Sequence, residues 1–238
     1  MKFFIIGLGS MGKRRIRNLH ALGYDEIAGY DTRLDRRLEA TKKYMVKIYP
    51  SFDEGLSDFC PDALVISTDP KHHMDYALRA AELNIPCFIE ASVSDIERII
   101  ELRDIIKDTG LLMAPSCTYR YFSGPKIIRD LVGQNLIGRV ININYQTGQY
   151  LPDWHPWENV EDFYVSNRET GGCREIVPFE LSWINEIFGS PRAISSIRRK
   201  ISEIEADIDD IYHVHLEYPN GVLASLTIEV VSRPCATR

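Results

Sequence analysis

The chain has 238 residues, of which 45% are hydrophobic and 26% charged, as in ordinary globular proteins that bury one large core or two modest ones. Its formal net charge of −6 argues against nucleic-acid and anionic-membrane partners, which a basic surface would favour. No apolar run reaches the length of a membrane span, and the apolar start lacks the length and cleavage region of a signal peptide. The five cysteines form no C-x-x-C pair, which favours reduced thiols in the cytoplasm and predicts no metal site.

The N-terminus carries the clearest motif. An apolar stretch, residues 3–6, leads into a Gly-x-Gly-x-x-Gly sequence, and an amphipathic helix follows. A strand, a glycine-rich turn and a helix in this order are typical of dinucleotide-binding sites. The first glycine allows a tight turn, the second lets the backbone approach a pyrophosphate, and the third brings the helix close to the sheet. Because the helix N-terminus offers N–H donors to phosphates, we expect the cofactor to be bound by Gly7, Gly9, Ser10, Met11 and Gly12.

The second expected strand, residues 26–30, ends on Asp31. This residue follows the last glycine by about 20 positions, the spacing at which an acidic residue meets the adenosine ribose. A carboxylate there would accept both ribose hydroxyls of NAD and repel the 2′-phosphate of NADP. Arg33 favours the opposite preference, because it could neutralise a phosphate or stack on adenine. We therefore expect NAD with NADP as the alternative, and Asp31 could instead simply cap the helix expected over residues 33–43.

Strand and helix patterns alternate through the rest of the first 115 residues. Residues 63–67 and 87–89 are continuous apolar runs, as expected for strands covered on both faces, and residues 111–114 give a last strand. Helix starts are indicated by two capping boxes and by one Asp-Pro pair, at Ser51 to Glu54, Ser94 to Glu97 and Asp69-Pro70. This order predicts an α/β fold: a doubly wound parallel sheet, or Rossmann fold, over residues 1–119.

Strands dominate beyond Pro115. We expect helices at 125–136 and 174–188, and strands over 140–146, 193–201, 211–218 and 222–231. Pro219-Asn220-Gly221 is a hairpin signal between the last two strands. The pattern predicts an α+β domain over residues 120–238 with a mostly antiparallel open sheet. An exposed face of such a sheet would favour a homo-oligomer that forms through it.

Taken together, these motifs resemble the Gfo/Idh/MocA family of NAD(P)-dependent sugar and inositol dehydrogenases, from Met1 to the C-terminus. Beyond the glycine turn, the resemblance rests on Ser67-Thr68-Asp69-Pro70 with His73, Phe88-Ile89-Glu90, Arg120-Tyr121-Phe122, Gly171-Gly172, and Asp210 with Asn220-Gly221. It implies an NAD-dependent oxidoreductase that acts on a CH–OH group of a sugar or sugar derivative. It also implies that the cofactor is contacted by Ser67, Thr68, His73, Glu90 and Ala91. Family members usually continue with more sheet, so the resemblance implies a longer second domain.

The sequence departs from the family where catalysis is expected. The family's Glu-Lys-Pro reads Glu90-Ala91-Ser92, and its usual Asp and His after the paired glycines are replaced by Ile176 and Phe179. Ala, Ile and Phe cannot transfer a proton, so either other groups do the chemistry or the protein is a silent dinucleotide sensor or scaffold. Similar replacements, with Gly172-Cys173-Arg174-Glu175 and a Trp-rich loop, resemble a branch associated with bacterial surface-sugar biosynthesis. We expect Arg174 and Glu175 to bind the substrate.

Glu180 lies in the middle of the apolar arc of the helix expected at 174–188. A carboxylate on a buried helix face must be paired, hydrogen-bonded or protonated. Glu180 is therefore either half of a structural ion pair, for instance with Arg120, or a general acid/base of raised pKa in the substrate pocket.

The segment Tyr150 to Glu158 places Trp154 and Trp157 on either side of His155. Indole packs well on the C–H faces of sugars and His155 is a proton carrier at neutral pH, so we expect a substrate site, although aromatics also pin loops by packing alone.

Tyr119 and Arg120 follow the last parallel strand, near the carboxyl ends where such sheets bind ligands. Arg120 could hold a carboxylate or phosphate of the substrate. The candidate catalytic residues are Glu180, His155 and Tyr119.

Overall fold

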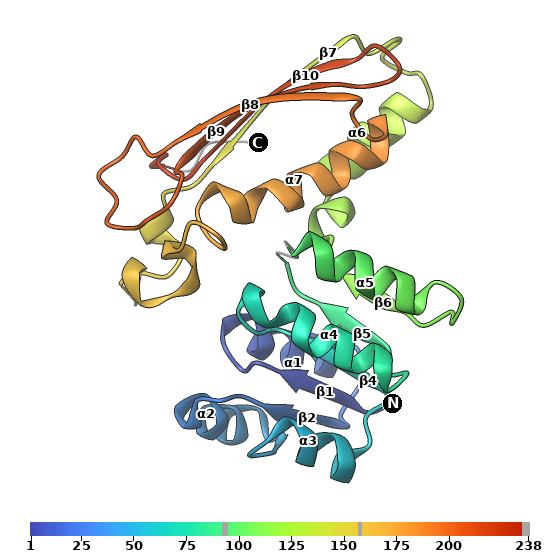
Figure 1. The fold of residues 1–238 in the computed structure, drawn as a ribbon, viewed down its shortest axis with the longest axis vertical. Coiled ribbons are helices and arrows are strands. Elements are labelled where there is room, and N and C mark those ends of the chain that lie inside the picture. The colour runs from blue at the N-terminus through green and yellow to red at the C-terminus, as the bar shows by residue number, and fades with distance from the viewer. Residues whose placement is uncertain (92–94, 157–158, 235–238) are drawn as a thin grey trace. The chain divides into compact units, whose positions relative to one another are not determined.

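The computed structural model describes residues 1–91, 95–156 and 159–234. The chain divides into two compact units, Met1–Ser116 and Cys117–Arg238 (Figure 1). The boundary expected from the sequence lies slightly further on, inside the 3-10 helix Thr118–Tyr121. Among the described helices, none has both the length and the apolar character that a membrane crossing requires.

A six-stranded parallel sheet forms the N-terminal unit, in the order β3-β2-β1-β4-β5-β6. The strands are β1 (Phe3–Ile6), β2 (Ile27–Tyr30), β3 (Lys47–Ile48), β4 (Ala63–Ile66), β5 (Cys87–Ile89) and β6 (Met113–Pro115). Because β1 pairs with β2 on one side and β4 on the other, the strand order reverses at β1. Doubly wound sheets bind ligands at the carboxyl ends of the strands beside such a reversal. The predicted Rossmann fold is confirmed.

Helices cover both faces of this sheet (Figure 1). On one face, α1 (Ser10–Ala21) and α2 (Leu34–Tyr44) pack against Ile5 and Val65. On the other face, Phe4 and Leu64 meet α3 (Phe52–Glu54) with the π-helix Gly55–Phe59, α4 (His73–Glu82) and α5 (Ile96–Ile106). Phe4 and Ile5 are both fully buried although they point to opposite faces, which explains the continuous apolar runs of the strands.

The helix starts follow the predicted signals with one change. The Ser51 Oγ accepts the Glu54 N–H at 3.2 Å, and Asp69 caps the 3-10 turn Pro70–His72 that leads into α4. At α5 the cap is Asp95, whose carboxylate accepts the Arg98 N–H at 3.2 Å. The expected cap, Ser94, lies outside the described residues.

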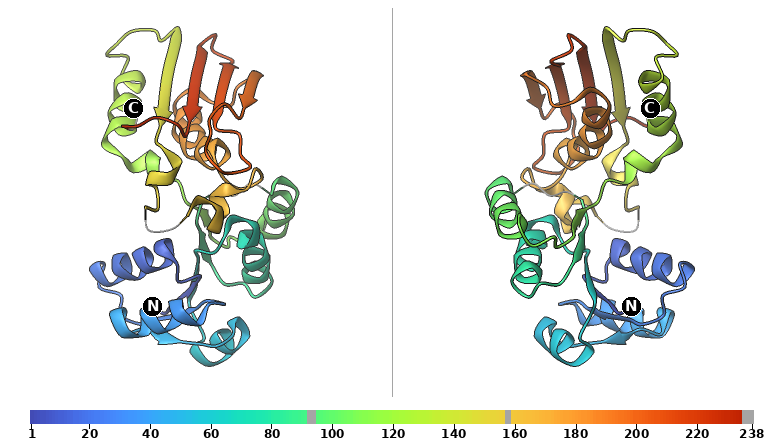
Figure 2. Two further views of the ribbon diagram at one scale, coloured as in Figure 1. Left: turned by 90° about the vertical axis from the view of Figure 1, so that its left-hand side faces the viewer. Right: turned by 90° about the vertical axis from the view of Figure 1, so that its right-hand side faces the viewer.

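A four-stranded sheet organises the C-terminal unit, in the order β7-β10-β9-β8 (Figure 2). Its strands are β7 (Asn142–Gly148), β8 (Ala193–Arg199), β9 (Ile211–Glu217) and β10 (Leu223–Glu229). Two of the three strand pairs are antiparallel and β10 pairs with β7 in parallel, so the sheet is mostly antiparallel, as predicted. Gly221 has a φ of +83° in the hairpin between β9 and β10, where glycine is favoured.

The helix α7 (Cys173–Phe188) packs on one face of this sheet, and α6 (Ser123–Gly133) contacts α7. Trp183 and Ile184 of α7 bury themselves against Leu216 of β9 and against β10. The strand alternation turns other side chains to the opposite face, among them Asn144, His213, His215, Ser225 and Thr227. That face presents hydrogen-bonding groups with little formal charge, and every residue of the edge strand β8 is exposed.

Candidate functional site

The glycine-rich turn joins β1 to α1 at the carboxyl edge of the parallel sheet. Gly7 has a φ of +88°, and a Cβ there would lie 2.5 Å from the backbone oxygen of Ser67. A Cβ on Gly12 would lie 1.9 Å from the backbone oxygen of Gly7. Since these neighbours are backbone atoms, the fold itself requires glycine at positions 7 and 12.

At position 9, by contrast, no neighbouring backbone atom requires glycine. Its φ of −69° suits any residue, and the nearest atom to an added Cβ is Nη1 of the flexible Arg36 side chain, at 3.4 Å. Gly9 is the N-cap of α1, where the first N–H groups have no acceptor within the helix and the first turn carries no acidic residue. The space over Gly9 therefore fits a dinucleotide pyrophosphate, which the N–H groups of Ser10, Met11 and Gly12 would hold.

Ser67 and Thr68 follow β4 beside this turn. Ser67 is buried, and its hydroxyl makes no hydrogen bond within the described part of the chain. A buried hydroxyl without a partner at the edge of a ligand site supports a contact with the cofactor. His73 is fully buried, and its Nε2 lies 3.0 Å from the Thr68 carbonyl oxygen. His73 therefore supports the loop from within the core, a different role from the direct contact expected.

Asp31 directly follows β2 and is 5% exposed. Its Oδ2 accepts the Leu8 N–H at 2.7 Å, and its Oδ1 accepts the Arg33 N–H at 2.8 Å. These contacts fix the carboxylate beside the glycine turn, and each oxygen keeps a lone pair for a ribose hydroxyl. Arg33 itself is the N-cap of α2, so Asp31 ties the turn to β2 instead of simply capping the helix.

The Arg33 guanidinium pairs with a carboxylate of its own loop. It forms two hydrogen bonds with Asp35, at 3.1 Å and 2.6 Å. The guanidinium lowers the pKa of the exposed Asp35 carboxyl to about 2. The expectation that Arg33 meets a phosphate or adenine loses its support, because this charge is already paired.

Glu90 directly follows β5 and is buried against Arg15 of α1. Two hydrogen bonds join them, and the one from Nη2 to Oε2 measures 2.9 Å. The guanidinium carbon also lies 4.7 Å from the centre of the Phe88 ring, a cation–π contact. Glu90 therefore fastens α1 to β5 behind the cofactor turn, and Ala91 follows it partly exposed. Ser92, the last residue of the Glu90-Ala91-Ser92 segment, lies outside the described residues.

Glu180 lies in the core between α7 and the C-terminal sheet and is fully buried. Its Oε2 accepts hydrogen bonds from the Tyr145 hydroxyl at 2.6 Å and from the Trp183 Nε1–H at 3.0 Å. The two donor rings contact each other edge to face, with centres 5.6 Å apart. This geometry supports a structural anchor and gives no support to the expected catalytic role.

Arg120 pairs with Glu186 instead of Glu180, which corrects the expected ion pair. Its Nε and Nη2 donate to the two carboxylate oxygens at 2.9 Å and 2.6 Å, and Arg129 adds a contact at 3.2 Å. The two guanidinium groups hold the pKa of the Glu186 carboxyl below its ordinary value. Because its charge is paired in this way, Arg120 is poorly suited to hold a substrate carboxylate or phosphate.

The aromatic segment after β7 packs onto a core cluster formed by Leu151, Val165, Cys173 and Ile176 with other apolar residues. Trp154 contacts this cluster, and the His155 ring stacks on Phe163 with centres 4.7 Å apart. Packing therefore accounts for the position of the Trp154 ring, while Trp157 lies outside the described residues.

The same region holds Glu175, whose Oε1 accepts a hydrogen bond from the Tyr164 hydroxyl at 2.7 Å. Glu175 is buried in the first turn of α7, directly after the paired glycines. Sequence reasoning missed Tyr164, because the irregular stretch around it has no periodicity or motif. Arg174 is partly buried beside Glu175.

The positions where the family carries its Asp and His hold apolar contacts. Ile176 belongs to the core cluster, and Phe179 lies 5.2 Å from the ring of Tyr119. Tyr119 also contacts Phe122, at 5.1 Å between ring centres. Ile176 and Phe179 are therefore held by apolar packing, and neither can transfer a proton.

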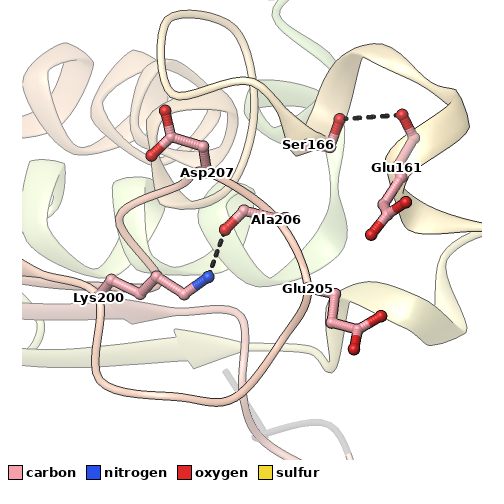
Figure 3. Close-up of a pocket in the computed structure, with 6 residues that line it drawn as sticks. All are labelled: Glu161, Ser166, Lys200, Glu205, Ala206 and Asp207. Carbon is pink, nitrogen blue, oxygen red and sulfur yellow. Dashed lines mark hydrogen bonds between the residues drawn. The ribbon is translucent and has the colours of Figure 1, made fainter.

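A separate open cavity of about 460 Å³ lies in the C-terminal unit (Figure 3). It is lined by Glu161, Ser166, Lys200, Glu205, Ala206 and Asp207. The Lys200 ammonium donates to the carbonyl oxygens of Ile204, at 2.7 Å, and Ala206. None of the residues predicted for the site lines this cavity, and the described residues contain no group of three metal-ligating side chains.

Comparison with known protein families identifies the family to which this chain belongs. Residues 1–115 match the model of the oxidoreductase family with an NAD-binding Rossmann fold, and residues 126–237 match the Gfo/Idh/MocA C-terminal domain. The chain belongs to the Gfo/Idh/MocA family. Its N-terminal unit is thus the NAD-binding Rossmann domain of that family, as predicted.

Relatives of this family member include trans-1,2-dihydrobenzene-1,2-diol dehydrogenases. The chain is 24% identical to the Bos taurus protein over 83% of its own length and 57% of the relative's. For the Sus scrofa protein the identity is 25%, over 84% of this chain and 58% of the relative. The chain thus spans a little over half the length of these curated relatives.

Solved structures of several dehydrogenases share the fold of this chain. A myo-inositol 2-dehydrogenase from Lactobacillus plantarum has a TM-score of 0.85 and 18% identity, over 96% of this chain and 69% of that one. The WlbA dehydrogenase from Bordetella pertussis, in complex with NADH and UDP-GlcNAcA, has a TM-score of 0.86 and 14% identity, over 98% and 73%. Identities this low show the common fold alone.

The position of Glu180 gives a prediction about stability. Glu180→Ala should lower the free energy of unfolding by about 2–4 kcal/mol, because it removes the acceptor of the buried Trp183 N–H and of the half-buried Tyr145 hydroxyl, whereas Glu180→Gln keeps an acceptor oxygen and should cost less. NAD⁺ affinity should not change in either variant, because Tyr145 and Trp183 belong to the C-terminal core. Chemical denaturation and calorimetric NAD⁺ titration measure the two quantities. An Ala variant as stable as the wild type would contradict the anchor.

Proposed function

We propose that this protein transfers hydride between a nicotinamide cofactor and a hydroxyl-bearing carbon of a sugar or sugar derivative. The main observation in favour of a cofactor concerns Gly9. Neither the backbone conformation at this position nor packing against neighbouring atoms requires glycine there. A ring carbon that bears a hydroxyl group is common to dihydrobenzenediol and myo-inositol, after which the similar proteins are named. This shared chemistry supports the substrate class.

Bound nicotinamide would supply the hydride exchange at its ring, and oxidation of the carbinol also releases the hydroxyl proton. Ala91, Ile176 and Phe179 cannot take this proton, and Glu180 is engaged in the core. We assign the proton to an imidazole nitrogen of His155. Its ring is held by the stack on Phe163 and is partly exposed. Tyr119 is enclosed by two aromatic rings and is less suited to the role.

Two buried donors support substrate binding in the same unit. Within the described residues, the Nε1 of Trp154 and the Nε of Arg174 have no hydrogen-bond partner. Such groups call for a polar ligand or water, so we assign them, with Glu175, to the sugar. The neighbour crystallised with UDP-GlcNAcA favours a setting in surface-polysaccharide biosynthesis.

The loss of the family's acid/base side chains favours a second candidate, a catalytically silent dinucleotide sensor or scaffold. Ile176 and Phe179 are well packed where the family keeps its proton carriers. The two candidates differ in turnover and not in cofactor binding.

The test is a turnover assay with NAD⁺ over a panel of sugars, inositols and nucleotide sugars. With the substrate that reacts best, His155→Asn should lower kcat by about 10²–10⁴-fold, the usual contribution of a positioned acid/base, and Glu180→Gln should leave kcat nearly unchanged. Normal turnover in folded His155→Asn would contradict the assignment of His155. Tight NAD⁺ binding without turnover on any substrate would favour the silent candidate.

We propose a cytoplasmic location, because the cysteines Cys60, Cys87, Cys117 and Cys173 are all thiols in the described chain. We also propose that the open face of the C-terminal sheet joins copies of this chain. Its uncharged polar side chains, such as Asn144, Ser225 and Thr227, can face a second copy without like-charge repulsion.

Ser225→Glu should therefore reduce the assembly. It places a carboxylate in the middle of the open face, where two copies would bring like charges together. The expected result is a lower molar mass by light scattering at micromolar concentration, while Asn18→Glu, on the exposed side of α1, leaves the mass unchanged. A monomeric wild-type chain, or an unchanged mass for Ser225→Glu, would contradict the proposed interface.

A further inference from the structure

Two histidines are neighbours on the open face of the C-terminal sheet. They lie on β9, an inner strand that pairs with β10 on one side and β8 on the other (Figure 1). His213 and His215 are two positions apart, so their side chains point to the same face, with Cα atoms about 7 Å apart. Both side chains are exposed. Directly opposite them on β10 are Thr227 and Ser225, which carry hydroxyl groups.

Each imidazole is oriented by the hydroxyl group opposite it. The Nδ1 of His215 lies 3.1 Å from the Oγ of Ser225, and the Nδ1 of His213 lies 3.2 Å from the Oγ1 of Thr227. With the proton on Nδ1, each ring donates to its hydroxyl, and Nε2 makes no hydrogen bond within the described residues. Histidines that bind metals are held in this way, because a hydrogen bond at one ring nitrogen fixes the tautomer and orients the other nitrogen toward the metal.

Within the described part of the chain, these two imidazoles are the ligands available for such a site. Glu217 comes next on the same face of β9, but a salt bridge holds its carboxylate to Arg192. No group of three potential metal ligands occurs among the described residues. Zinc in structural sites takes four ligands in a tetrahedral arrangement, so a zinc ion bound here needs two more.

A second copy of the chain can supply the missing ligands. Two copies that face each other across a two-fold axis bring the same surface together, and therefore the same pair of histidines. Sheets that pack face to face lie about 10 Å apart. This spacing leaves room for an imidazole from each side with a zinc ion between them, at zinc–nitrogen distances of about 2 Å.

We propose that His213 and His215 bind Zn²⁺ together with the same two histidines of a second copy, so that one ion joins two chains through the open face. The site consists of histidines and thus differs from the cysteine sites that the sequence excludes. The inference rests on the proposed interface and adds a ligand and a stoichiometry to it. It is independent of the dinucleotide site, because both histidines belong to the C-terminal unit.

The test is a titration of the untagged, chelator-treated full chain with zinc chloride, followed by calorimetry and light scattering. Zn²⁺ should bind at one ion per two chains. The chain concentration at which the assembly dissociates should fall about tenfold or more, because the ion binds the assembled form in preference. A chelator should reverse the change.

His213→Gln and His215→Gln should each remove this effect while the fold is kept, since both side chains are exposed. Thr227→Val should weaken Zn²⁺ binding about tenfold, because it removes the hydroxyl that orients His213, and Thr227→Ser should restore the affinity. His72→Gln is the matched control. It removes an exposed histidine of the N-terminal unit that pairs with Asp75, and should change neither the stoichiometry nor the mass.

Binding of one Zn²⁺ per chain without a shift in mass would overturn the inference, as would unchanged Zn²⁺ binding in the two histidine variants. An assembly that forms equally well with Zn²⁺ and with chelator would also overturn it, and would leave the proposed interface in place. A chain that stays monomeric under both conditions would contradict the interface as well. NAD⁺ affinity, measured on the same samples, tests the dinucleotide function separately.

Discussion

The N-terminal unit depends on how closely the backbone of α1 approaches the end of β1. The Gly12 Cα comes so near the Gly7 carbonyl oxygen that a Cβ would lie 1.9 Å from it, and Gly7 in turn lies against the backbone of Ser67 after β4. This approach brings the first N–H groups of α1 to the carboxyl edge of the sheet, beside the point where the strand order reverses. The Leu8 N–H then reaches Asp31, so β1, β2 and β4 all converge on one ligand space.

Several charged residues that look functional in the sequence hold the structure together. Glu90 binds Arg15 and fastens α1 to β5, Arg120 binds Glu186, and Glu180 anchors Tyr145 and Trp183. Each of these buried or half-buried groups is engaged by the partners named, within its own unit. The chemistry proposed for the C-terminal unit therefore falls to the partly exposed His155 and to two buried donors, Trp154 Nε1 and Arg174 Nε, that make no hydrogen bond within the described residues.

The helices, the strands and the cofactor turn could be predicted from the sequence because their signals are local. The apolar runs, the Ser51 capping box and the Asn220-Gly221 hairpin each occupy a few consecutive residues, and the structure confirms them. The partners of the charged side chains could not be predicted, because they are far apart in sequence. Arg15 and Glu90 are separated by 75 positions, and Arg120 and Glu186 by 66. No local pattern distinguishes Arg33, which binds Asp35, from Arg36, which lies over Gly9.

The cofactor site is tested most directly by measuring both the NAD⁺ affinity and the stability of the Gly9→Val variant. The backbone at Gly9 suits any residue and only the Arg36 side chain is near, so the variant should unfold at close to the wild-type denaturant concentration. Its valine would occupy the pyrophosphate space, and NAD⁺ should bind at least about a hundredfold more weakly. Gly12→Ala provides the contrast, since its Cβ meets the Gly7 backbone and should destabilise the fold itself. A folded Gly9→Val protein with wild-type NAD⁺ affinity would contradict the assignment of this space to the cofactor.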